Sequence, residues 1–176
     1  MLSLPYHNPL WVADRALFLD MLLRAVSCSG SDRGALPGDA GMIGIEVEEQ
    51  RSTLEEDTDV LMHLLRSDEA AHGGDPRYKL RNARSQYSAY SDFDIGVAAI
   101  ASPTGPRIAG KHGIGLLSIG ATAAGGFDAL AHHWDVMEAR AAEFGTGRRR
   151  DKWRLVGPMH IAETKEQAIE DVMRPQ

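Results

Sequence analysis

The sequence contains 176 residues, 43% of them hydrophobic, and has a formal net charge of −6. This length predicts one domain with a packed core, while the negative charge argues against binding to nucleic acid or to an anionic membrane surface. A single cysteine excludes an internal disulfide and fits a reducing compartment, and no apolar run or signal-like start predicts membrane insertion or secretion, so we expect a cytoplasmic protein.

The first part of the chain predicts a helix, a strand and a glycine-rich loop. Residues 1–9 suit the tail of a strand that turns into a helix, and apolar side chains at helical spacing predict that helix over 10–23. A strand is expected at about 25–29, although its serines make it a poor central strand. The loop over 30–44 carries five glycines and a proline. Loops of this kind after a strand hold ligand contacts in many α/β proteins.

The next part predicts one strong helix and an irregular segment. Leucines at helical spacing predict a helix over 46–67. His63 follows Asp59 by four residues, which indicates an exposed ion pair along the helix more strongly than two metal ligands. Residues 67–94 are polar and form either a short hairpin or a connecting segment whose tyrosines contact a substrate or a neighbouring subunit.

Residues 95–126 predict a βαβ unit with a candidate anion site. Strands are expected over 95–100 and 114–120, with a turn over 101–106 and a helix over 107–113 that ends at a glycine C-cap. The turn brings two hydroxyls and free backbone N–H groups to the start of a helix, which is a suitable place for a phosphate. The residues concerned are Ser102, Thr104 and Gly105, with Arg107 just beyond them. Serine and threonine are also ordinary helix caps, so this reading stays open.

The last part predicts a helix over 127–144, a strand over 153–162 and a helix over 165–173 that a capping box opens. Adjacent histidines at 132 and 133 point about 100° apart on a helix, so we expect them to be structural or solvated. Strands that alternate with helices predict a parallel α/β sheet. The pattern leaves open whether this sheet is an open domain of flavodoxin type or part of a barrel.

The string ASPTGPRIAGKHGIGLLSIGA resembles the bacterial-luciferase-like flavin-dependent monooxygenases, and in particular their limonene-monooxygenase-like branch. The likeness extends to LPYHNPLWVADR, GALPGDAGMIGIE and WRLVGPMHIAETKEQAIEDV, so it covers nearly the whole chain. The resemblance implies a TIM (β/α)8 barrel, which has about 250 residues. Residues 1–176 would then be a single luciferase-like domain that is incomplete, about the middle half of the barrel, giving an α/β fold class of partial-barrel type.

The resemblance also implies a function. Family members use reduced FMN from a separate flavin reductase to insert one oxygen atom of dioxygen into a small apolar substrate such as a terpene, alkane or aldehyde; other branches use a deazaflavin, which we expect less here. It places the FMN phosphate at Ala101, Ser102 and Gly105 and adds Arg33, whose alternative role is that of a solvated loop charge. Asp39 would lie near the flavin or simply form a turn.

The resemblance assigns neither a catalytic residue nor a metal ligand. His7 is the nearest substitute for a histidine beside the flavin ring, but a structural role suits it better. We expect a homo- or hetero-oligomer, because a partial barrel leaves strand edges unpaired. The alternative function is a non-catalytic flavin-binding or subunit-forming fragment of such a protein.

Overall fold

The computed structural model describes residues 2–24, 29–34, 36–73, 77–92, 94–120, 126–147, 150–157 and 159–173. The helices are α1 (Pro9–Leu23), α2 (Pro37–Met42), α3 (Gln50–Arg66), α4 (Thr104–His112), α5 (Ala129–Phe144) and α6 (Lys165–Met173), with short 3-10 helices at Leu4–Tyr6 and Arg150–Lys152. The strands are β1 (Leu2–Ser3), β2 (Ser29–Asp32), β3 (Ala71–Gly73), β4 (Leu80–Ala83), β5 (Ile95–Ala99), β6 (Gly115–Ser118) and β7 (Trp153–Leu155). In the described part of the chain, no helix has the length and apolar character needed to cross a membrane.

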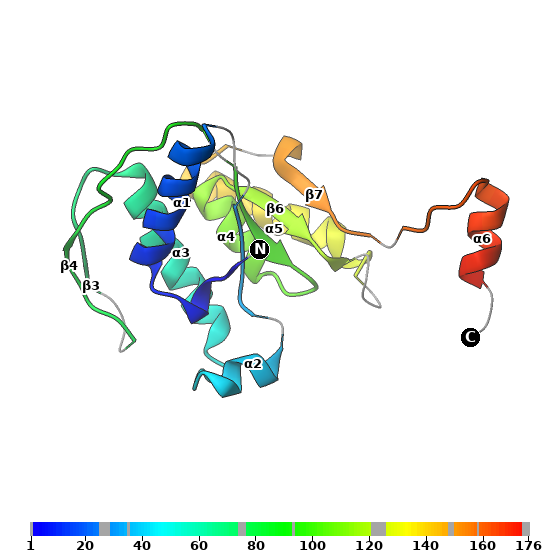
Figure 1. The fold of residues 1–176 in the computed structure, drawn as a ribbon, viewed down its shortest axis with the longest axis horizontal. Coiled ribbons are helices and arrows are strands. Elements are labelled where there is room, and N and C mark those ends of the chain that lie inside the picture. Colours follow the sequence, from blue (N-terminus) through cyan, green and yellow to red (C-terminus); the bar gives the residue numbers. More distant parts are fainter. Residues whose placement is uncertain are drawn as a thin grey trace.

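Within the described residues, a parallel sheet with the strand order β1-β2-β5-β6-β7 forms the centre of the fold (Figure 1). Each neighbouring pair is parallel, as in the ladder that pairs Val97 with Leu116. All carboxyl ends of these strands therefore lie at one edge of the sheet, where α/β proteins bind their ligands. The predicted alternation of parallel strands and helices, of partial-barrel type, is confirmed.

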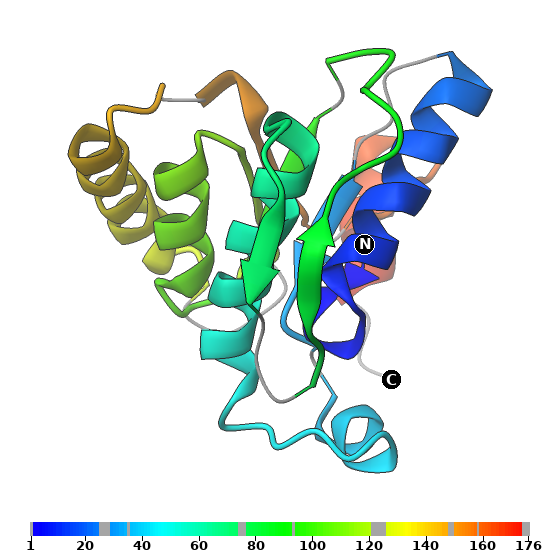
Figure 2. The same cartoon turned by 90° about the vertical axis from the view of Figure 1, so that its left-hand side faces the viewer.

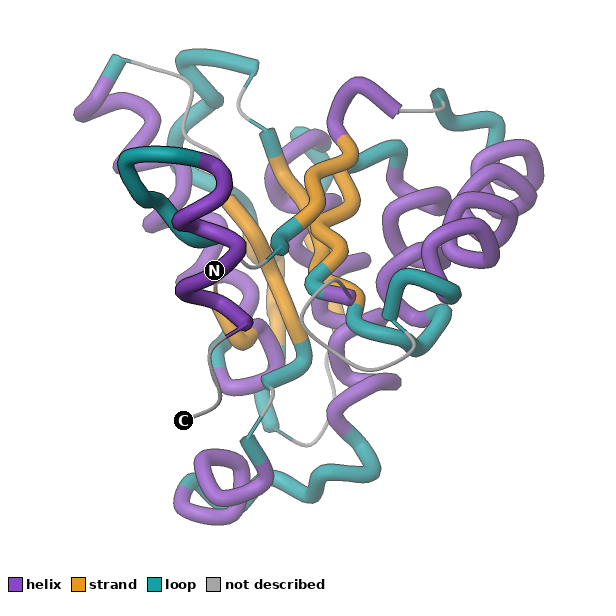
Figure 3. The backbone as a smooth tube through the Cα atoms, turned by 90° about the vertical axis from the view of Figure 1, so that its right-hand side faces the viewer, coloured by secondary structure: helices purple, strands orange, loops and turns teal. Residues whose placement is uncertain are grey.

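The helices α1, α3, α4 and α5 form one layer over the sheet. α1 contacts α3, α3 contacts α4 and α4 contacts α5, and Figure 2 shows them side by side in that order. Val97 of β5, Leu116 of β6 and Ile108 of α4 are almost fully buried between the sheet and this layer. The strands lie centrally among the helices (Figure 3). This single curved layer of helices is the arrangement of a (β/α) barrel wall.

Local signals explain several element ends. Asn8 caps α1, since its side chain accepts a hydrogen bond from the Leu10 N–H at 2.9 Å. Gly113 ends α4 with a φ of 60°, as predicted, and Gly145 ends α5 with a φ of 66°. Glycine adopts this left-handed conformation without steric strain. α4 itself begins at Thr104, three residues earlier than the predicted helix.

The predicted glycine-rich loop over 30–44 contains more secondary structure than expected. Residues 25–28 of the predicted first strand lie outside the described residues, and β2 occupies Ser29–Asp32, which shares Ser29 with the predicted strand and otherwise lies in the predicted loop. Its residues have low strand propensity, and parallel pairing with β1 and β5 on both sides outweighs that preference. α2 was also missed, although Pro37 at its first turn and Asp39 just after are typical of a helix start.

The end of the chain also differs from the prediction. The strand predicted over 153–162 ends at Leu155. α6 follows as predicted, and the Gln167 N–H donates to the Thr164 hydroxyl at 3.2 Å, which is half of the predicted capping box. Figure 1 shows α6 apart from the other helices, beyond an extended segment. No described side chain of α6 is buried.

The segment over 67–94 contains a hairpin and an anchor to α3. β3 and β4 pair in antiparallel fashion. The buried carboxylate of Asp57 on α3 accepts hydrogen bonds from Arg77 and from the hydroxyl of Tyr78, both at 2.9 Å.

The predicted ion pair between Asp59 and His63 along α3 is wrong, because Asp59 instead binds Lys111 and His112 of α4. Contacts between neighbouring helices, which local spacing does not reveal, decide the partner.

The end of this segment is held by Asp20 of α1. Its buried carboxylate accepts hydrogen bonds from the Ser91 hydroxyl and from the N–H groups of Ser91 and Tyr90. The Ser91 hydroxyl is the main cause that holds the pKa of Asp20 below its ordinary value of 3.8, against the opposing effect of burial.

The lowered pKa of Asp20 predicts a loss of stability in acid. Its contribution is complete above the unfolded-state pKa and is lost as the pH falls through the lower folded-state pKa. We expect the urea concentration at the unfolding midpoint to decrease as the pH is lowered below about 4. The decrease should be less steep in Asp20→Asn, because asparagine cannot accept all three hydrogen bonds. Urea unfolding from pH 6 to pH 2 measures both slopes, and equal slopes would show that Asp20 does not contribute.

Candidate functional site

A cavity of about 320 Å³ opens at the carboxyl edge of the sheet, between the ends of β2 and β5 and the start of α4. Its apolar lining residues are Leu54, Ala98, Ala99, Ile100, Ala101 and Ile119. Its other lining residues are Asp32, Arg33, Gly34, Arg51, Ser102, Thr104 and Gly105. An apolar lining with a few polar groups is typical of a site for an organic ligand with a charged substituent.

The structure brings the predicted cofactor-binding residues to this one cavity. Arg33 follows β2, whereas Ala101, Ser102 and Gly105 follow β5, and all four line the same space. β2 and β5 are adjacent parallel strands, so the segments after them meet at the same edge. This convergence was expected from resemblance, and here it follows from the strand order.

The connection from β5 to α4 presents hydroxyl and amide groups. Ser102 Oγ lies 3.2 Å from Thr104 Oγ1 and accepts a hydrogen bond from the Thr104 N–H at 3.3 Å. Pro103 is the N-cap and provides no side-chain hydrogen bond to the helix. The N-terminal N–H groups of a helix carry a partial positive charge, which favours an anion at this point.

Gly105 has a packing role at this connection. A Cβ atom at this position would lie 2.6 Å from the carbonyl oxygen of Ala98 and 2.9 Å from the Cβ of Ala99. The absence of a side chain therefore lets the first turn of α4 approach the end of β5. This contact keeps the start of the helix at the cavity.

Two arginines give the lining of the cavity its positive charge. Arg33 is half-buried, and Arg51 lies exposed in the first turn of α3. Asp32 has the opposite charge, but its Oδ1 accepts hydrogen bonds from the Ser3 hydroxyl at 3.0 Å and from the Gly34 N–H at 2.7 Å. The ionisable side chains among the described lining residues therefore carry a net charge of +1. A planar guanidinium suits phosphate oxygens well.

Arg51 was not predicted from the sequence. A cation in the first turn of a helix faces the positive end of the dipole, so it is unfavourable for the helix itself. A positive charge at this unfavourable place indicates a role other than helix stability. The sequence reveals it only when the helix is known to begin at Gln50. The helix predicted from residue 46 placed Arg51 away from its start.

Other predicted candidates lie outside the described lining of the cavity. Arg107 faces Glu55 of α3 at 3.6 Å, and Asp39 is exposed in the first turn of α2. His7 is exposed just before α1. His132 is exposed, whereas His133 is fully buried, and in the part of the chain that the structure describes no cluster of side chains suits a metal ion.

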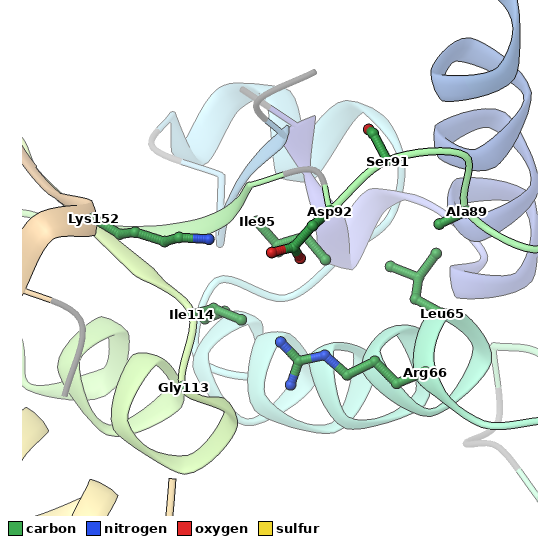
Figure 4. A pocket seen from close by; sticks show the side chains of 9 residues that line it. All are labelled: Leu65, Arg66, Ala89, Ser91, Asp92, Ile95, Gly113, Ile114 and Lys152. Atoms are coloured by element: carbon green, nitrogen blue, oxygen red, sulfur yellow. The ribbon is translucent and has the colours of Figure 1, made fainter. Parts of the chain in front are cut away.

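A smaller cavity of about 120 Å³ lies at the opposite edge, beside the amino-terminal ends of β5 and β6. Figure 4 shows Arg66 and Lys152 extending toward its middle, near Asp92. Arg66 already donates to the His112 carbonyl oxygen, and Lys152 pairs with Asp94. In parallel barrels this edge serves stability and the carboxyl edge serves chemistry, so we take the larger cavity as the candidate site.

Comparison with known sequences gives a consistent result. Residues 2–176 match the sequence model of the family described as "Luciferase-like monooxygenase". The chain is 43% identical to limonene 1,2-monooxygenase of Rhodococcus erythropolis, over 98% of this chain and 44% of that protein. It is 34% identical to 4-hydroxyprotoasukamycin monooxygenase of Streptomyces nodosus subsp. asukaensis, over 98% of this chain and 48% of that protein. The chain thus spans less than half the length of these curated relatives.

Solved structures share the fold. Monooxygenase RslO1 from Streptomyces bottropensis superimposes with a TM-score of 0.80 at 16% identity, over 97% of this chain and 51% of that one. The oxygenating constituent of 3,6-diketocamphane monooxygenase from Pseudomonas putida, solved with FMN, gives 0.67 at 24% identity, over 97% and 49%. An F420-dependent secondary alcohol dehydrogenase gives 0.66 at 18% identity, over 85% and 44%. At these identities the likeness concerns the fold alone.

Proposed function

Because the chain belongs to the luciferase-like monooxygenase family, we propose that its carboxyl-edge cavity binds the phosphate end of FMN in a flavin-dependent monooxygenase. The reaction would use reduced FMN from a separate reductase, with dioxygen and a small apolar substrate such as a terpene, alkane or aldehyde. The observation that carries the proposal is the convergence of Arg33, Arg51, Ser102 and the start of α4 on one cavity. Each of these groups favours an anion.

The residues present fit a phosphate monoester. Two guanidinium groups offer charged donors, Ser102 and Thr104 offer hydroxyls, and the first turn of α4 offers the Gly105 N–H. Leu54, Ala98, Ala99, Ile100 and Ile119 supply apolar surface that suits the uncharged part of the cofactor or the substrate. Reduced flavin supplies the electrons for oxygen activation when it is bound. The chain's own groups hold and orient the cofactor through its phosphate, and the apolar wall excludes water.

The preference for FMN over a deazaflavin is part of the proposal. Solved structures of this fold include one complex with FMN and one with an F420 adduct. A cavity lined by two cations and a helix start suits the two negative charges of a terminal monoester, which FMN carries and an internal phosphodiester does not. We therefore expect FMN to compete effectively against F420.

An anaerobic titration tests the proposal. The purified protein is titrated with FMN, reduced FMN, F420 and riboflavin, which is FMN without its phosphate, and binding is followed by flavin absorbance and fluorescence. FMN in at least one redox state should bind at least about tenfold more tightly than riboflavin, since one charge-assisted hydrogen bond is worth about 1.5–3 kcal/mol. Equal affinity for FMN and riboflavin would refute a phosphate site, and tighter F420 binding would replace FMN as the cofactor.

A further inference from the structure

His133 lies buried in the interface between α5 and α4. Its side chain has no exposed area, and Met137 and Ala141, one and two turns later on the same helix face, are also buried. An aliphatic side chain would fill this space without removing two polar nitrogens from water. Burial of an imidazole is unfavourable unless its polar atoms make contacts. The contacts of His133 therefore indicate what the residue does.

One imidazole nitrogen contacts the backbone beside the candidate site. His133 Nε2 lies 3.2 Å from the carbonyl oxygen of Ala101. A carbonyl oxygen only accepts, so Nε2 carries the proton and donates it. Nδ1 is then an acceptor that has no hydrogen-bond partner among the described residues. Ala101 lines the cavity whereas His133 is absent from its described lining, so the histidine acts on the site through the Ala101 carbonyl.

This hydrogen bond fixes the direction of the next N–H group. In a trans peptide, the carbonyl of one residue and the N–H of the next point in opposite directions. The Ala101 carbonyl is directed at α5, so the Ser102 N–H is directed away from α5. Ser102 itself lines the cavity. The Ser102 N–H is thereby available as a further donor for an anion at the start of α4.

We propose that His133 is a positioning residue for anion binding: its Nε2–H holds the Ala101–Ser102 peptide so that the Ser102 N–H faces the bound phosphate. The inference rests on the proposed function, because it presupposes that the cavity binds a phosphate. It adds a residue from outside the cavity, and it explains why a histidine occupies a position where packing alone favours an aliphatic side chain.

Three substitutions separate positioning from packing. His133→Leu fills the space without a donor. His133→Gln keeps an amide N–H near the place of Nε2, and His133→Asn keeps an amide near the place of Nδ1, too short to reach Ala101. The measured quantity is the riboflavin dissociation constant divided by that of FMN. We expect this ratio to fall about tenfold in the leucine and asparagine variants and to stay near the wild-type value in the glutamine variant, as for the loss of one hydrogen bond to a charged group.

The outcomes are distinguishable. His132→Leu, at the exposed neighbouring position, is the matched control and should keep the wild-type ratio. A folded leucine or asparagine variant with the wild-type ratio overturns the inference, as does an equal loss of FMN and riboflavin affinity in all three variants. If the leucine and asparagine variants do not fold, as judged by circular dichroism without flavin, His133 serves packing and the inference is also overturned. A wild-type protein that does not distinguish FMN from riboflavin refutes the proposed function instead.

Discussion

A protein in which both Arg33 and Arg51 are replaced by alanine should bind FMN roughly 100-fold more weakly than the wild type, a difference of about 2.7 kcal/mol. Both residues line the cavity, and they come from different parts of the chain. Hydrogen bonds between charged groups are worth about 1.5–3 kcal/mol each, and the exposure of Arg51 reduces its share through solvent screening. Anaerobic titration with reduced and oxidised FMN measures the change.

Riboflavin affinity should be unchanged in the same variant, because riboflavin has no phosphate. Arg81→Ala is the matched control: Arg81 is exposed on β4, outside the described lining of the cavity. The wild-type preference for FMN should also weaken as ionic strength rises. If the double variant binds FMN as tightly as the wild type does, the two arginines do not hold the phosphate and the site must be sought elsewhere.

Replacing Gly105 with valine should lower the free energy of unfolding by about 3 kcal/mol. The first added carbon would lie 2.6 Å from the Ala98 carbonyl oxygen and 2.9 Å from the Ala99 Cβ. The first of these atoms is backbone and the second is the Cβ next to it, so neither can rotate away, and α4 must shift from β5. Urea unfolding measures the loss, and FMN affinity should fall as the start of α4 leaves the cavity.

Gly41→Val is the matched control for this substitution. Gly41 also lies in a helix, but a Cβ at that position has nothing within 4 Å among the described atoms. The expected change is within about 0.5 kcal/mol. Valine has a higher helix propensity than glycine, so propensity does not predict a loss at either position. Equal destabilisation by the two substitutions would therefore show that the contact with β5 does not explain the loss at Gly105.

The central unit was predictable because its signals are local. A β-branched run that ends in a turn, followed by a short helix with a glycine C-cap, indicates β5 and α4 without any knowledge of their neighbours. The meeting of Arg33 with Ser102 was also predictable in outline. It requires only that the strands before them are parallel and adjacent.

The features that sequence reasoning missed depend on contacts between distant segments. β2 has the sequence SGSD, and its strand conformation comes from pairing with β1 and β5. The role of Gly105 is set by the Ala98 carbonyl, and that of His133 by the Ala101 carbonyl. Both carbonyl oxygens belong to the backbone of β5 or of the turn after it. No local pattern of residue types reveals such a partner.

The order of strands also has a kinetic consequence. Gly96 pairs with Gly115 across one short helix, whereas α2, α3 and the β3–β4 hairpin lie between Ser31 and its partner Val97 in the sequence. Closing a longer loop loses more chain entropy, so contacts close in sequence form earlier in folding. We expect pulsed hydrogen exchange to protect the amides of β6 before those of β2. The cavity is lined by residues that follow β2 and by residues that follow β5, so it is completed only when β2 joins the sheet.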